Sequence, residues 1–166
     1  MSTTSGTAPG AGARGTDPAA ATEAAAAALP APTVRVLGDL AAAAHLAEEL
    51  SATGPAEGRF DVVHLGVGPD AHVCSLFPGH PAALLTGGDV VAVHSSPKPP
   101  PERVSLTFDA LHRSRCVMAV AGGAGKAEAV RAGLGAPDVV RAPASCARGR
   151  ATTWYLDDAA ASGLTG

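Results

Sequence analysis

Apolar residues along the chain form short blocks that polar, glycine-rich or proline-rich segments separate. Blocks of mainly large apolar residues predict strands at 34–37, 60–65, 89–93, 116–120 and 152–156. Stretches with apolar residues on one side and turn residues at their ends predict helices at 39–50, 106–111, 126–134 and 157–164. Strands that alternate with helices predict an α/β fold, with a mainly parallel sheet and flanking helices.

The strand predicted at 60–65 reads FDVVHL and ends at Gly66. An apolar, β-branched run of this length is typical of a parallel strand that is buried on both faces and leads into a glycine-rich turn. We therefore expect His64, inside the run, to be a packed histidine.

The first part of the chain differs from the rest. Residues 1–32 consist mainly of Ser, Thr, Gly, Ala and Pro, with hardly any large apolar side chain. Such a segment buries too little surface to offset the entropy lost on ordering. We predict a disordered Ala/Gly/Pro-rich tail at 1–32 and a single α/β domain at 33–166.

Composition narrows the classes of ligand. The formal net charge is −3 and no run of Lys or Arg occurs, which argues against a nucleic acid or an acidic membrane as the partner. The three cysteines fit no metal or redox spacing, and neither a secretory signal nor a membrane span is recognisable. These features predict a soluble, cytoplasmic protein that binds a small molecule.

The candidate chemistry lies in the run from Gly66 to His80, which reads GVGPDAHVCSLFPGH. In an open α/β sheet, ligands bind beyond the carboxyl ends of the strands, where this loop begins. Gly66 and Gly68 allow the backbone to approach a ligand closely. His72 is suited to act as a general base, and Asp70 to orient its imidazole or bind a substrate hydroxyl. On spacing alone, a loop histidine without a catalytic task fits equally well.

This run resembles the signature G-M-G-x-D-G-H-T-A-S-L-F-P-G of the 6-phosphogluconolactonases, in the glucosamine-6-phosphate isomerase/6-phosphogluconolactonase superfamily. Three further segments follow in the family's order. They are SPKPPPERVSLT at 96–107, GGAGKAE at 122–128 and TWYLD at 153–157 with Ala159 and Ala160. The resemblance covers about Arg59 to Ala161. It implies a Rossmann-like sheet of the sugar-phosphate isomerase type, of which this chain resembles the C-terminal portion.

The resemblance also implies an activity and a site. The family hydrolyses 6-phospho-D-glucono-1,5-lactone to 6-phosphogluconate, in the pentose phosphate pathway, without a metal or another cofactor. His72, with Asp70, takes the place of the base that activates water, while Gly66 and Gly68 line the substrate. Arg103 and Lys126 match positions near the substrate phosphate, which a guanidinium and an ammonium suit. Without the family, Lys126 and Lys98 read as solvated surface charges.

Two departures from the family pattern lead to further expectations. Ala71 stands where the family usually has Gly, and alanine is strained if that position is left-handed. No Ser-Gly-Gly-Ser phosphate loop or Asp-Glu-Arg segment precedes Phe60, so the chain is expected to be N-terminally truncated, with an exposed sheet edge open to self-association. The alternatives are a catalytically impaired sugar-phosphate-binding module and, less close in sequence, a glucosamine-6-phosphate deaminase/isomerase relative.

Overall fold

The computed structural model describes residues 41–53 and 59–164. The tail predicted at 1–32, its boundary with the domain, and the strand predicted at 34–37 lie outside these residues. The helix predicted at 39–50 corresponds to α2, Ala41–Thr53.

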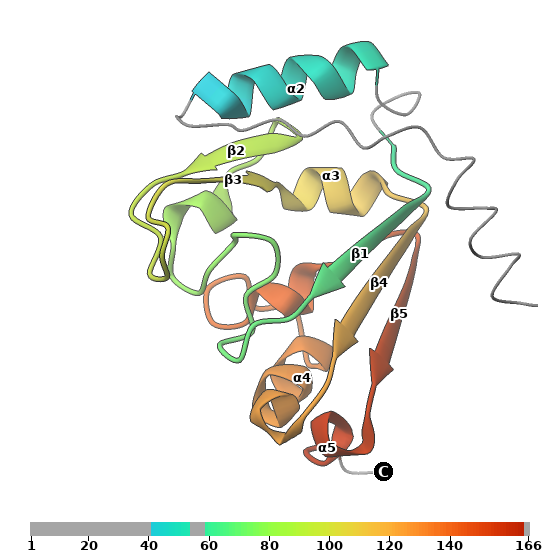
Figure 1. Ribbon diagram of the computed structural model, residues 1–166. Coiled ribbons are helices and arrows are strands. Elements are labelled where there is room, and N and C mark those ends of the chain that lie inside the picture. Colours follow the sequence, from blue (N-terminus) through green and yellow to red (C-terminus); the bar gives the residue numbers. More distant parts are fainter. Residues whose placement is uncertain (1–40, 54–58, 165–166) are drawn as a thin grey trace, which may run out of the picture. The chain divides into compact units, whose positions relative to one another are not determined.

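A parallel sheet of three strands organises the described residues. Its strands are β1 (Val62–Gly66), β4 (Cys116–Ala121) and β5 (Ala151–Leu156), in the order β1-β4-β5. Both pairings are parallel, and Val62, Cys116 and Ala151 lie side by side at one end. The three arrows run the same way in Figure 1, so their carboxyl ends share one edge. The predicted α/β fold with a mainly parallel sheet is confirmed.

The next two strands form a separate antiparallel pair. β2 (Val90–Val93) pairs with β3 (Arg103–Leu106), and the loop 94–102 connects them. The helix predicted from residue 106 is therefore wrong at its start, because α3 spans Phe108–Arg113. The Thr107 side chain accepts a hydrogen bond from the amide of Ala110, and this N-cap sets where the helix begins.

Helices follow the second and third parallel strands. After β4, a short 3₁₀ turn, η3 (Ala124–Lys126), leads into α4 (Ala127–Leu134), which ends at Gly135 as predicted. After β5, Asp157 caps α5 (Asp158–Ala161), which is shorter than the predicted helix. Two more 3₁₀ turns, η2 (Pro81–Leu84) and η4 (Pro143–Cys146), lie in the connections.

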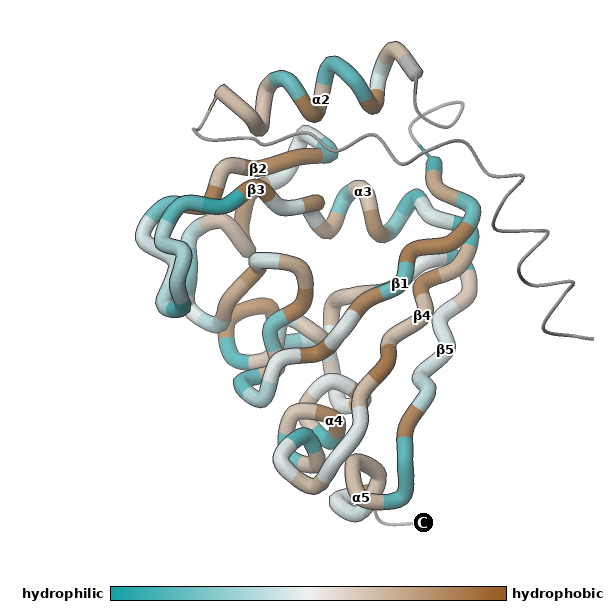
Figure 2. The backbone as a smooth tube through the Cα atoms, viewed as in Figure 1, coloured by the Kyte–Doolittle hydropathy of each residue, from teal (hydrophilic) through white to brown (hydrophobic). Residues whose placement is uncertain are grey.

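The core lies against one face of the sheet. Val63 and Leu65 of β1 are buried together with Val117 and Ala119 of β4. Figure 2 shows hydrophobic residues concentrated along β1, β2 and β4. In the described residues the other face of β1 is exposed, including Val62 at 49%. The prediction of a strand buried on both faces is wrong here.

His64 lies on this exposed face as well and is not a packed histidine. Side chains alternate between the two faces of a strand, and only the face of Val63 and Leu65 is covered by other described residues.

Candidate active site

An open hollow of about 470 Å³ lies at the carboxyl end of β1. Its lining comes from β1, from the loop that follows, and from η3: His64, Leu65, Gly66, Val67, Gly68, Pro69, His72, Cys74 and Lys126. Four of the six residues proposed from the sequence are among them, namely Gly66, Gly68, His72 and Lys126. The carboxyl edge of a parallel sheet is where α/β proteins place their ligands.

The loop after β1 folds into a tight turn that carries His72. The amide of Gly68 donates to the carbonyl of His72 at 2.9 Å, and the amide of Ala71 donates to the carbonyl of Gly68 at 3.0 Å. Leu76 and Phe77 follow as fully buried anchors. Because the Gly68 and Ala71 amides are engaged inside the turn, they hold the loop together and are not free donors for a ligand.

Glycine is required at position 68 by its neighbours. A Cβ added there would overlap the His72 ring and approach Oδ1 of Asp70 to 2.6 Å. A real Cβ does not come so close to another heavy atom, so any side chain would displace the imidazole. The second glycine of the G-x-G pattern thus serves here to admit the histidine.

Ala71 adopts a left-handed backbone with φ of 61°, and its side chain is buried. This conformation costs an L-residue about 1–2 kcal/mol relative to glycine. The expected strain at this departure from the family pattern is confirmed.

We expect Ala71→Gly to raise the free energy of unfolding by about 1 kcal/mol, since the relief of strain exceeds the loss of one buried methyl group. Ala119→Gly, at an equally buried position in β4, is the matched control and should lower it. Urea denaturation of the two variants measures both changes. A destabilised Ala71→Gly variant would contradict the argument.

Asp70 and His72 form the central pair of the site. Nδ1 of His72 lies 2.6 Å from Oδ1 of Asp70, with the two side chains 18% and 35% exposed. Burial acts to raise the pKa of Asp70, but hydrogen bonds with His72 and Lys98 outweigh it and lower this pKa to about 2. Asp70 is therefore an anion at neutral pH, suited to hold the Nδ1–H tautomer and leave Nε2 free as a base.

Lys98 joins this pair from the loop between β2 and β3. Its ammonium lies 3.0 Å from Oδ1 of Asp70 and 3.4 Å from Nδ1 of His72. Sequence reasoning missed this residue, because it treated Lys98 as a solvated surface charge. Its position between prolines in the SPKPPPER segment was the available signal.

Arg103 occupies a different place from the other candidates. Its guanidinium donates to the carbonyls of Lys98, Pro99 and Pro100 at 2.9–3.1 Å, and so holds the loop that carries Lys98. It also lies 5.4 Å from the ring centroid of Phe77, which contacts the His72 ring at 4.4 Å. Arg103 does not line the hollow; it supports the site from behind Phe77.

Lys126 reaches the hollow from η3, the turn that follows β4, and β4 is the neighbour of β1 in the sheet. Lys126 precedes α4, and its ammonium donates to the carbonyl of Val67 at 2.7 Å. Residues 126 and 67 are far apart in sequence, but β1 and β4 are paired neighbours whose carboxyl ends meet. The structure thus places an ammonium and the His72 imidazole around one opening.

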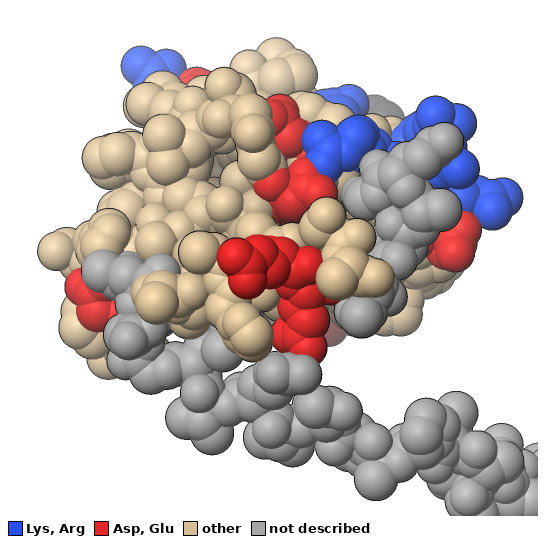
Figure 3. Space-filling view, turned by 90° about the horizontal axis from the view of Figure 1, so that it is seen from above, with Lys and Arg blue, Asp and Glu red and all other residues tan. Residues whose placement is uncertain are grey.

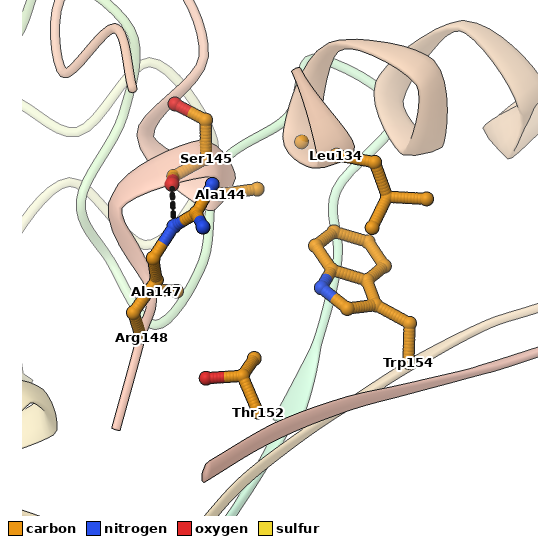
Figure 4. Close-up of a pocket in the computed structure, with 8 residues that line it drawn as sticks. Leu134, Ala144, Ser145, Ala147, Arg148, Thr152 and Trp154 are labelled. Atoms are coloured by element: carbon orange, nitrogen blue, oxygen red, sulfur yellow. Dashed lines mark hydrogen bonds between the residues drawn. The ribbon is translucent and has the colours of Figure 1, made fainter. Parts of the chain in front are cut away.

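A second pocket of about 140 Å³ lies between α4, η4 and β5 (Figure 4). Leu134 and Trp154 face it, and Arg148 is tied to the carbonyl of Ser145 at 2.9 Å. Trp154 packs against Gly133, where an added Cβ would approach its ring to 2.5 Å. Trp154 therefore has a packing role in this small pocket and does not line the hollow of His72.

Other features of the described residues bear on possible ligands. On the face shown in Figure 3, charged side chains lie in small groups among uncharged surface. Within 41–53 and 59–164, no helix is long and apolar enough to cross a membrane. In the same ranges, no three His, Cys, Asp or Glu side chains gather in a way that could hold a metal ion.

The chain is similar in sequence to known 6-phosphogluconolactonases. A 6-phosphogluconolactonase from Streptomyces coelicolor is 51% identical over 130 residues, which are 75% of this chain and 50% of that protein. One from Mycobacterium tuberculosis is 49% identical over 132 residues, 76% of this chain and 53% of that protein. The chain therefore spans about half the length of these relatives.

Solved structures give the same result. The 6-phosphogluconolactonase from Trypanosoma brucei superposes with a TM-score of 0.63 at 28% identity, over 84% of this chain and 59% of that one. The family model described as glucosamine-6-phosphate isomerases/6-phosphogluconolactonase matches residues 17–155, from well upstream of Arg59. The chain belongs to the glucosamine-6-phosphate isomerase/6-phosphogluconolactonase family.

Proposed function

We propose that the chain provides the histidine-bearing part of a 6-phosphogluconolactonase site and hydrolyses 6-phospho-D-glucono-1,5-lactone to 6-phosphogluconate. The observation that carries this proposal is the His72 imidazole, hydrogen-bonded through Nδ1 to Asp70, in an open hollow that Lys126 also lines. A neutral imidazole with a carboxylate on one nitrogen is a general base for water. The names of the similar proteins supply the substrate.

In the proposed reaction, Nε2 of His72 takes a proton from water while the water oxygen bonds to C1 of the lactone. The tetrahedral intermediate then collapses, the bond between C1 and the ring oxygen breaks, and His72 returns the proton to that oxygen. The new carboxylic acid ionises at neutral pH. Asp70 stabilises the imidazolium between these two proton transfers.

Two cations are proposed for the substrate phosphate, and one of them, Lys126, lines the hollow. Lys126 lies at the N-terminus of α4, where the helix dipole also favours a phosphate. Arg103 is the second proposed phosphate ligand, although its Nε and Nη2 atoms already bind backbone carbonyls. The Gly68 and Ala71 amides are engaged inside the turn, so they are not assigned to the developing oxyanion.

The test is acid release from 6-phospho-D-glucono-1,5-lactone by the purified chain. We expect a rate above spontaneous hydrolysis that saturates with substrate, and no ammonia from glucosamine 6-phosphate. Acid release only at the spontaneous rate would refute the hydrolase.

A second candidate is a sugar-phosphate-binding module without turnover. The strained Ala71, directly before His72, favours it, because a small displacement of a catalytic group costs much of the rate. Binding of 6-phosphogluconate in calorimetry, combined with no acid release above the spontaneous rate, would select this candidate.

A further inference from the structure

One oxygen of Asp70 serves two partners. Oδ1 lies 2.6 Å from Nδ1 of His72 and 3.0 Å from the ammonium of Lys98, and those two nitrogens are 3.4 Å apart. An ionised carboxylate only accepts hydrogen bonds, so the Nδ1–H group and the Lys98 ammonium both donate to the same oxygen. The imidazole and the ammonium thus share the charge of one carboxylate.

The charge of the Lys98 ammonium opposes the task proposed for His72. A carboxylate beside the imidazole stabilises the imidazolium that forms when the base takes a proton. Lys98 neutralises part of that carboxylate and places a second positive charge next to the ring. Lys126, His64 and Cys74 line the hollow, and Arg103 lies 5.4 Å from the ring centroid of Phe77, which contacts His72. Asp70 is the carboxylate that the described residues place against His72.

The Lys98 side chain is placed to leave without moving its loop. Arg103 holds the backbone of that loop through three carbonyls, whereas the Lys98 side chain is 40% exposed. A phosphate dianion carries more charge than one carboxylate and attracts an ammonium strongly. A ligand with a phosphate can therefore take Lys98 from Asp70, whereas an uncharged ligand of the same shape cannot.

We propose that Lys98 is a positioning residue that restrains the Asp70–His72 pair in the free chain, and that a phosphorylated substrate releases the pair by drawing the ammonium away. This inference rests on the proposed function. Release of Lys98 makes His72 fully effective as a base only when a phosphorylated substrate is bound. This role of Lys98 differs from simple phosphate binding, because removal of its charge should raise kcat/KM for a substrate that has no phosphate.

The test compares two lactones and the variant Lys98→Met, which keeps the length of the side chain and removes its charge. For unphosphorylated glucono-1,5-lactone, kcat/KM should rise about threefold to tenfold, because nothing draws Lys98 away in the wild-type chain. For the phosphorylated lactone it should fall about tenfold or more, mainly through KM. Lys98→Arg should keep the wild-type rate with the unphosphorylated lactone.

Arg150→Met is the matched control for loss of one positive charge, since Arg150 is exposed and lies outside the site. It should leave both rates within twofold of the wild type. An unchanged or slower rate of Lys98→Met with the unphosphorylated lactone would overturn the proposal. Turnover of the phosphorylated lactone would show, in that case, that the proposed function still holds.

An NMR measurement at neutral pH tests, without turnover, whether a phosphorylated ligand draws Lys98 away from Asp70. Saturating 6-phosphogluconate should shift the carboxyl ¹³C resonance of Asp70 in the wild type, and shift it much less in Lys98→Met, which has no ammonium to lose. Lys126 resonances report whether the ligand binds. Equal Asp70 shifts in the two proteins, with the ligand bound, would refute the release. If neither Asp70 nor Lys126 responds, both this inference and the proposed function fail.

Discussion

Replacement of His72 by Gln should lower kcat for 6-phospho-D-glucono-1,5-lactone by about 10²–10⁴-fold, the usual contribution of a positioned general base. Glutamine fills similar space and can still hydrogen-bond Asp70, but its amide does not accept a proton from water. KM should change little, since the proposed phosphate contacts come from Lys126 and Arg103. The measurement is initial acid release, corrected for spontaneous hydrolysis.

His112→Gln is the matched control. His112 is exposed in α3, and its Nε2 lies 2.9 Å from the carbonyl of Cys146, a contact that a glutamine amide can replace. Its kcat should stay within twofold of the wild type. If His72→Gln retains the full rate while His112→Gln does not, the catalytic base has been assigned to the wrong residue.

The second large loss of kcat is expected from Gly68→Ala, which adds a single methyl group. Gly68→Ala adds one methyl group where the His72 ring and Oδ1 of Asp70 already lie, so the imidazole must move away from its carboxylate. A displacement of about 1 Å at a catalytic group costs on the order of 10²-fold in rate. We expect kcat to fall by about that factor while the folded structure persists, because the turn is exposed on the side of the hollow.

Gly125→Ala tests whether any added methyl near the site has this effect. Gly125 is exposed in η3, and an added Cβ there would meet no atom within 4 Å. Its activity and its circular dichroism spectrum should match those of the wild type. Equal activity of Gly68→Ala and Gly125→Ala would show that the geometry of the His72 loop does not limit the reaction.

Local sequence was a good guide where neighbouring residues make the site. Asp70 and His72 stand two positions apart on one loop, after a recognisable strand, and their contact follows from that spacing. Gly68 belongs to the same turn. The C-cap at Gly135 and the N-cap at Asp157 also follow from local chemistry, because a cap is formed by residues within one helical turn.

Local sequence was a poor guide where the outcome depends on distant partners. β2 resembles a strand of the parallel sheet in composition, yet it pairs with β3 in an antiparallel hairpin. His64 lies in an apolar run, yet what covers a strand comes from other segments of the chain. A pattern of apolar residues indicates that a side chain can be buried. Whether the side chain is buried depends on the other segments of the fold.

The sequence by itself determined the α/β class, the strand that leads into the histidine loop, and the Asp70–His72 pair, because each arises from residues close together along the chain. Only the tertiary structure decided that Lys98 reaches Asp70 and that Lys126 shares the hollow. Those contacts join residues 28 and 59 positions apart. They exist because strand pairing and loop packing bring separate segments to one edge of the sheet, and no local pattern encodes that arrangement.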